Sequence, residues 1–335
     1  MSVLEKMPFS LLELASVPTG SDIPATLLEL RRYAQHADTL GFTRLWLAEH
    51  HNMEGIASSA TSVLISDLAA HTELMRIGSG GIMLPNHPPL VVAEQFGTLA
   101  SLYPDRIDLG LGRAPGTDPL TSRALYRDER RADNFPEEVA ELQRLLGKDV
   151  DASLGKAHAY PGRDTNVPIW ILGSSLFSAQ LAAKRGLPYA FAGHFAPALA
   201  EEALSLYRRL FKPSATLQRP YAILCLPLIL ADTDEEARYL STSSQQRVLA
   251  LMYGKPLYLP PPVTDMDLHW DFASKRQVEN FLALAVVGSP TTVSFKLQTI
   301  LKQFEVDELM FTNDIYDRSK RLQALSLLNG LDVSN

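Results

Sequence analysis

The chain has 335 residues, of which 46% are hydrophobic and 21% are charged, and its formal net charge at pH 7 is -7. This composition is typical of a globular protein with a large core. The acidic balance, without a basic stripe, gives no indication of a nucleic acid or an anionic membrane as a partner. The single cysteine, Cys225, excludes an intrachain disulfide and a cysteine-based metal site.

Short apolar runs rich in β-forming residues alternate with longer amphipathic segments. The N-terminal segment MSVLEKMPFSLLELA has an early acidic residue and no basic region before a long apolar run, so we predict no signal peptide and a cytoplasmic location. No apolar stretch approaches the roughly 20 residues that a membrane helix needs. Strands are predicted at residues 9–16, 44–50, 77–84, 106–113, 168–174, 189–194, 222–231 and 307–313. Helices are predicted at residues 23–40, 59–71, 89–102, 134–147, 175–186, 197–211, 232–252, 291–304 and from 317 onward.

About eight strands that alternate with helices indicate parallel βαβ units. The strands are nearly continuous apolar runs, as expected when both faces of a sheet are covered. We therefore predict a single (β/α)8 TIM barrel over residues 1–335, with an open doubly wound sheet as the alternative.

Two segments interrupt this rhythm, at about residues 149–168 and 253–276, and we expect them as insertions at the C-terminal face of the barrel. The second insertion is rich in proline and carries Tyr258, Trp270 and Phe272. A loop of this length in a compact domain is usually functional or disordered. We interpret the second insertion as a lid over the barrel mouth, with a surface excursion as the alternative.

Polar residues and glycines follow the predicted strands, and in a barrel these strand ends meet on one face, where the active site lies. Glu49, His50 and His51 follow the second strand, and His194 follows the sixth. Successive side chains of an extended chain alternate in direction, so we expect one of the two adjacent histidines in the pocket and the other outside it. No standard zinc-binding spacing is present, and we predict no metal site.

A phosphate site is indicated by two of the strand ends. The sequence GLGRAPG only weakly resembles a dinucleotide fingerprint, but it places Arg113 where a guanidinium could bind a phosphate through two hydrogen bonds. The sequence GSSLFS turns from strand into helix and brings Ser174, Ser175 and Ser178 to a helix N-terminus, which favours anions. Together these residues predict a site for one phosphate of a cofactor, and an ordinary serine cap is the alternative. Gly80 and Gly81 inside the third strand indicate close approach to the backbone.

Several long blocks of the sequence resemble the bacterial-luciferase-like flavin monooxygenases. The resemblance runs in order from Phe9 to about Leu328 and is closest to a single-chain branch of that family rather than to the light-emitting subunits. It is carried by LWLAEHHNMEGIASSA, IGSGGIMLPNHPPLVVAEQFGTL, YPDRIDLGLGRAPGTD, PIWILGSSLFSAQLAAKRGLPYAFAGHFAP and VGSPTTVSFKLQTIL.

The resemblance implies a TIM barrel that uses reduced FMN, which a separate NAD(P)H:flavin reductase supplies. In that family, reduced flavin and O2 form a C4a-peroxide or hydroperoxide that oxygenates an organic substrate. The resemblance also implies a homodimer. The substrate itself is not readable from the sequence, although apolar pocket walls and an aromatic lid favour a small hydrophobic molecule.

The resemblance further assigns roles to individual residues. It places His50 in the active site. We expect His50 to act as a general base or to orient the peroxide, with Glu49 as its partner, and we take His194 as a second candidate for the pocket. The resemblance assigns the FMN phosphate to Arg113, Ser174, Ser175 and Ser178, and a cis peptide bond beneath the flavin ring to Gly80 and Gly81. Ser174 stands where the luciferases have Glu, and Gly112 stands where they have a reactive Cys. Both departures argue against luminescence and not against flavin binding.

Two other functions remain open at this point. Some relatives of these enzymes use a deazaflavin and transfer hydride without O2, and others store flavin without catalysis. The presence of His50 and of the lid-like insertion favours an enzyme over a storage protein.

Overall fold

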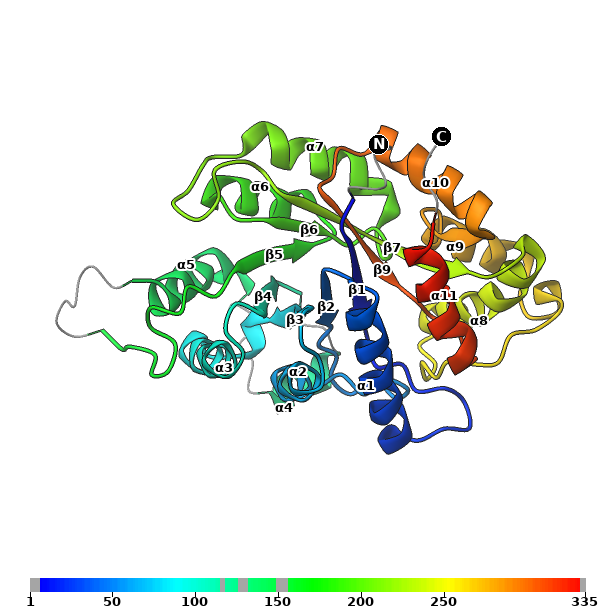
Figure 1. Ribbon diagram of the computed structural model, residues 1–335, viewed down its shortest axis with the longest axis horizontal. Helices are drawn as coiled ribbons and strands as arrows, with labels where there is room; N and C mark the ends of the chain where they lie inside the picture. The colour runs from blue at the N-terminus through cyan, green and yellow to red at the C-terminus, as the bar shows by residue number, and fades with distance from the viewer. Residues whose placement is uncertain (1–6, 115–117, 126–131, 149–155, 332–335) are drawn as a thin grey trace.

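The computed structural model describes residues 7–114, 118–125, 132–148 and 156–331. Eight parallel strands close into a barrel, and helices surround it (Figure 1). Closure is made by the pairing of β6 with β7, of β7 with β9 and of β9 with β1. The chain therefore forms the predicted TIM barrel, and the open sheet is excluded.

The strands are β1 (Phe9–Glu13), β2 (Arg44–Leu47), β3 (Arg76–Met83), β4 (Ile107–Gly112), β5 (Ile169–Gly173), β6 (Tyr189–Phe191), β7 (Ala222–Leu230), β8 (Val286–Gly288) and β9 (Glu308–Thr312). The α-helices are α1 (Ile23–Thr39), α2 (Thr61–Ala70), α3 (Pro89–Leu102), α4 (Pro119–Ala124), α5 (Phe135–Leu146), α6 (Leu176–Arg185), α7 (Ala200–Leu210), α8 (Asp234–Met252), α9 (Phe272–Phe281), α10 (Pro290–Gln303) and α11 (Arg318–Asn329). Short 3-10 helices span Leu84–Asn86, Pro197–Leu199 and Met266–Leu268.

Strand β8 and helices α4 and α9 were not predicted from the sequence. Strand β8 has three residues, pairs with Leu228–Leu230 at the end of β7 and lies outside the closed barrel. Helix α9 begins inside the second insertion, where the side chain of Asp271 caps it by accepting a hydrogen bond from the Ser274 N–H. A three-residue strand and a single helix cap give too little periodicity to stand out in a polar segment.

A buried ionic network fills the N-terminal end of the barrel. Nη1 of Arg44 donates to Oδ2 of Asp108 at 2.7 Å, and its Nε and Nη2 donate to the two Glu308 carboxylate oxygens at 2.8 and 3.0 Å. The guanidinium carbon also lies 4.7 Å from the ring centroid of Trp170. The barrel can bury this ionic network because every charge in it has a partner. The candidate site residues lie at the other, C-terminal end of the barrel.

The two insertions lie at opposite ends of the barrel. Residues 156–168 lead from α5 into the first residue of β5, so this segment belongs to the N-terminal end rather than to the expected C-terminal face. Residues 149–155 lie outside the described part of the chain. Residues 253–271 cross the C-terminal mouth, where the Leu257 N–H donates to Glu54 O at 2.7 Å and the Leu259 N–H donates to Val17 O at 2.9 Å.

The aromatic residues of the second insertion do not line the central cavity. The hydroxyl of Tyr258 donates to Glu54 at 3.2 Å, the indole N–H of Trp270 donates to Asp267 at 2.8 Å, and Phe272 is largely exposed. Leu257 is the residue of this segment that reaches the cavity. The expectation that aromatic residues of this segment cover the pocket is therefore wrong, and the segment contacts the cavity through the aliphatic side chain of Leu257.

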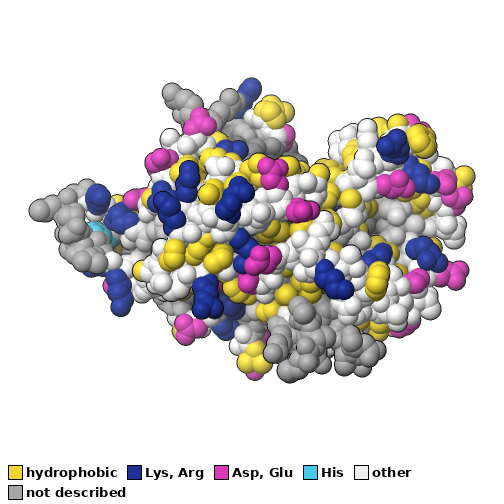
Figure 2. Space-filling model, turned by 90° about the horizontal axis from the view of Figure 1, so that it is seen from above, with side chains coloured by type: hydrophobic (Ala, Val, Ile, Leu, Met, Phe, Trp, Pro, Cys, Tyr) yellow, Lys and Arg dark blue, Asp and Glu magenta, His cyan; other side chains and the backbone are white. Residues whose placement is uncertain are grey.

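The surface carries charges of both signs. Figure 2 shows Lys and Arg side chains interspersed with Asp and Glu over the face that it presents. Within the described residues, no helix is both long and apolar enough to cross a membrane.

Candidate active site

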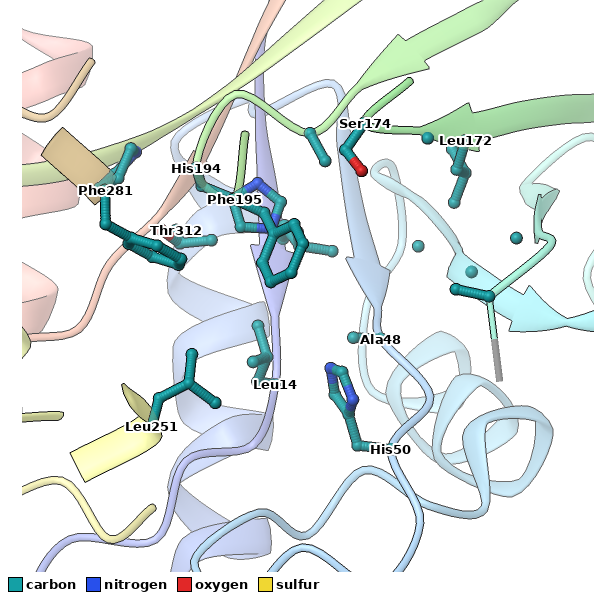
Figure 3. Close-up of a pocket in the computed structure, with 18 of the residues that line it drawn as sticks. Leu14, Ala48, His50, Leu172, Ser174, His194, Phe195, Leu251, Phe281 and Thr312 are labelled. Carbon is teal, nitrogen blue, oxygen red and sulfur yellow. The ribbon is translucent and has the colours of Figure 1, made fainter. Parts of the chain in front are cut away.

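A cavity of about 690 Å³ opens at the C-terminal ends of the strands. Its volume is in the range of small-molecule and cofactor sites. His50, Arg113 and His194 line it, and so do Gly80, Gly81, Ser174, Ser175 and Ser178. Figure 3 shows the rings of His50 and His194 and the hydroxyl of Ser174 around one space. The predicted site residues are thus brought together, with the exception of Glu49.

The two adjacent histidines point in different directions, as expected from the alternation of side chains. His50 lines the cavity, whereas Nε2 of His51 lies 2.8 Å from Oε1 of Glu49. The same carboxylate oxygen lies 2.8 Å from Nε2 of His87, and Oε2 accepts a hydrogen bond from the Met83 N–H at 3.1 Å. Glu49 is buried outside the cavity lining, so the expected pairing of Glu49 with His50 is replaced by one with His51 and His87.

Hydrogen bonds keep Glu49 ionised. Burial opposes the charge, but the hydrogen bonds from His51, His87 and the Met83 N–H outweigh burial and hold the pKa of the Glu49 carboxyl at about 2. The potential ligand atoms of Glu49, His51 and His87 lie within 4.8 Å of one another, close enough to hold a metal ion. No metal-binding spacing is visible in the sequence here, because His87 follows a different strand from Glu49.

The predicted phosphate residues gather at one end of the cavity. The guanidinium carbon of Arg113, which follows β4, lies 4.2 Å from the ring centroid of Phe177 in the first turn of α6. Ser174 and Ser175 form the turn that enters this helix. The hydroxyl of Ser178 donates instead to the Ser175 carbonyl at 2.8 Å, so Ser178 braces the turn.

The third strand is irregular where it reaches the cavity. The peptide bond between Gly80 and Gly81 is cis, as the resemblance implied, and the pairing of β3 with β4 shifts between Ser79 and Ile82. The Ser79 hydroxyl replaces the lost ladder bonds, since it donates to Gly110 O at 2.8 Å and accepts from Gly110 N at 2.9 Å. A Cβ on Gly80 would lie 2.9 Å from Trp46 Cβ, and one on Gly81 would lie 2.6 Å from the backbone oxygen of Gly110. Larger residues therefore do not fit at these two positions.

The opposite end of the cavity contains polar residues that were not predicted as site residues. Arg247 on α8 and Asp314 after β9 both line the cavity, and Nη1 of Arg247 donates to Oδ2 of Asp314 at 2.7 Å. Arg247 lies within a helix whose sequence is that of an ordinary amphipathic surface helix, so it could not be identified as a site residue from the sequence.

His194 lines the cavity with a ring that is partly buried. Its Nδ1 is buried and has no hydrogen-bond partner among the described residues. Burial lowers the pKa of His194 to about 4, with Asp314 opposing this change and His50 adding to it. His194 therefore stays neutral at physiological pH.

The chain matches the family model described as luciferase-like monooxygenase over residues 7–308. Among its relatives, a luciferase-like monooxygenase of Escherichia coli is 49% identical over 322 residues, which cover 95% of each chain. The N-acetyl-S-alkylcysteine monooxygenase of Bacillus subtilis is 38% identical over 190 residues, which cover 55% of this chain and 56% of that one.

Solved structures agree with this result. The crystal structure of apo-MsnO8 has a TM-score of 0.85 and 33% identity, covering 96% of this chain and 97% of that one. The oxygenating constituent of 3,6-diketocamphane monooxygenase from Pseudomonas putida, in complex with FMN, has a TM-score of 0.72 and 18% identity, with 97% and 98% covered. An F420-dependent secondary alcohol dehydrogenase has a TM-score of 0.70 and 13% identity, with 98% and 100% covered. The last two likenesses show the fold alone.

Proposed function

Because the chain belongs to the luciferase-like monooxygenase family, we propose that it is an FMN-dependent monooxygenase that acts on a small hydrophobic organic molecule. The observation that carries the proposal is that one cavity joins Arg113 and the N-terminus of α6 to Gly80, Gly81 and His50. When bound, reduced FMN supplies two electrons, so that one atom of O2 enters the substrate and the other leaves as water. Supply of reduced flavin by a separate NAD(P)H:flavin reductase and assembly as a homodimer belong to the same proposal.

The residues present fit FMN. The cation of Arg113, the hydroxyls of Ser174 and Ser175 and the N–H groups of the first turn of α6 offer donors for a phosphate at one end of the cavity. Gly80 and Gly81 present backbone without side chains on the wall. Glycine at both positions lets a ligand ring approach the backbone closely.

The remaining walls define the space for the substrate. Leu14, Leu251, Phe195 and Phe281 line the cavity with apolar side chains (Figure 3). Apolar walls of this kind favour a hydrophobic substrate. His50 faces this space, and its imidazole can accept or donate a proton at the substrate.

A deazaflavin is the second candidate cofactor, because a structure of the same fold binds an F420–acetone adduct. Equilibrium titration of the protein with FMN and with F420, followed by the quenching of cofactor fluorescence, separates the two. The proposal predicts saturable binding of FMN that is tighter than that of F420. Binding of F420 with no measurable binding of FMN would replace the monooxygenase by a hydride-transfer enzyme.

A further inference from the structure

One face of α8 forms the wall of the cavity opposite the proposed phosphate site. Ser244, Arg247, Val248 and Leu251 all line the cavity, and they follow the spacing that places residues on one side of a helix. Three of these side chains carry no charge. Arg247 is therefore the single cation that this helix presents to the cavity.

Arg247 has unused hydrogen-bonding capacity. Its side chain is 8% exposed, and within the described part of the chain its one hydrogen bond is the 2.7 Å contact from Nη1 to Asp314. A guanidinium carries five N–H donors in a planar fork. Leaving donors of a buried cation without partners is costly, so the other four are available to a group that enters the cavity.

The surroundings of Arg247 indicate the rest of the ligand. Leu251 and Phe281 line the same cavity with apolar surface. A ligand that satisfies this end of the cavity has an apolar body and one anionic end.

We propose that Arg247 binds the carboxylate of the organic substrate, and that the substrate is a small carboxylic acid whose apolar arm extends toward His50. A carboxylate matches the guanidinium fork with two parallel hydrogen bonds. Asp314 competes with the substrate carboxylate for Arg247 and holds the guanidinium in place when the site is empty. The orientation of the apolar arm toward His50 rests on the proposed function. Binding of the carboxylate by Arg247 does not require flavin.

The test is calorimetric titration of the protein, with and without FMN, with octanoate and with methyl octanoate. We expect the acid to bind more tightly than the ester. Arg247→Met keeps the length and the packing of the side chain and removes the fork, so it should weaken binding of the acid by about 10- to 100-fold and leave the ester unchanged. Arg209→Ala, on the exposed side of α7, is the control.

Asp314→Asn should change the affinity for octanoate in the opposite direction. It also provides a test if Arg247→Met fails to fold. Removal of the competing carboxylate should tighten binding of octanoate, whereas a purely structural ion pair would lose stability without any gain in affinity. Equal affinities of acid and ester in the wild type, or an unchanged preference in Arg247→Met, would overturn the proposal. Failure of FMN to bind, with the acid still bound through Arg247, would overturn the proposed function and leave this site standing.

Discussion

Nε2 of His51 lies 2.8 Å from Oε1 of Glu49, and this contact turns the acid of the E-H-H sequence away from the cavity. Glu49 also accepts from His87 and from the Met83 N–H, so it ties the end of β2 to the end of β3. The adjacent His50 is then left on the cavity side. Glu49 is a positioning residue in this arrangement, and the proposed proton transfer falls to His50.

Glu49→Gln should make the protein less stable at neutral pH. The pKa of the Glu49 carboxyl is about 2 in the folded protein against 4.5 in an unperturbed chain. A lowered pKa contributes stability above the unfolded value, and this contribution is lost as the pH falls toward the folded value. We expect the wild type to exceed Glu49→Gln by roughly 3 kcal/mol in free energy of unfolding above pH 5, with the gap closing toward pH 2. Urea denaturation at a series of pH values measures this difference in free energy of unfolding. A difference that stays constant between pH 5 and pH 2 would contradict the role of the charge.

The ring of His194 should titrate far below neutral pH. Burial lowers its pKa to about 4, and Asp314 acts in the opposite direction. The ring signals of His194 in NMR spectra, identified by their loss in His194→Gln, are therefore expected to stay constant from pH 8 to pH 5. Asp314→Asn should lower the pKa further because it removes the one neighbouring charge that raises it. A titration near pH 6.5 would show that the ring is solvated.

Arg113→Ala should weaken the binding of FMN. Hydrogen bonds to charged groups contribute about 1.5–3 kcal/mol, so the dissociation constant is expected to rise by about 10- to 150-fold. Riboflavin lacks the phosphate and should lose far less affinity, which separates a phosphate contact from damage to the cavity. Arg209→Ala is again the control, and unchanged affinity for FMN would remove Arg113 from the site.

His50→Ala should lower turnover and leave flavin binding nearly intact. The imidazole lines the cavity beside Ala48 and Leu14, so its loss removes a proton acceptor without removing a phosphate ligand (Figure 3). General acid–base groups contribute about 100- to 10,000-fold to rate. Product formation with a reductase present, compared with the dissociation constant of FMN, measures both effects. Equal turnover in the variant and the wild type would assign His50 to packing.

Apolar runs were sufficient to predict the eight strands of the closed barrel, because both faces of a parallel sheet are buried, whereas the three-residue strand β8 was missed. The sites at the strand ends followed from them, since the fold brings these ends together whatever the intervening sequence. The Arg44 network could not be predicted, because its partners Asp108 and Glu308 lie 64 and 264 residues away. The role of Arg247 could not be predicted for a related reason. Its partner Asp314 follows β9 and is distant in the sequence, so only the fold brings the two residues together.

The most direct test of the monooxygenase assignment is stopped-flow absorbance after the protein and anaerobically reduced FMN are mixed with oxygenated buffer. Flavin bound in this largely apolar cavity would be shielded from solvent, so we predict a phase of flavin reoxidation slower than that of free FMN, with an amplitude that increases with protein concentration. A time course identical to that of free FMN at every protein concentration would contradict the account.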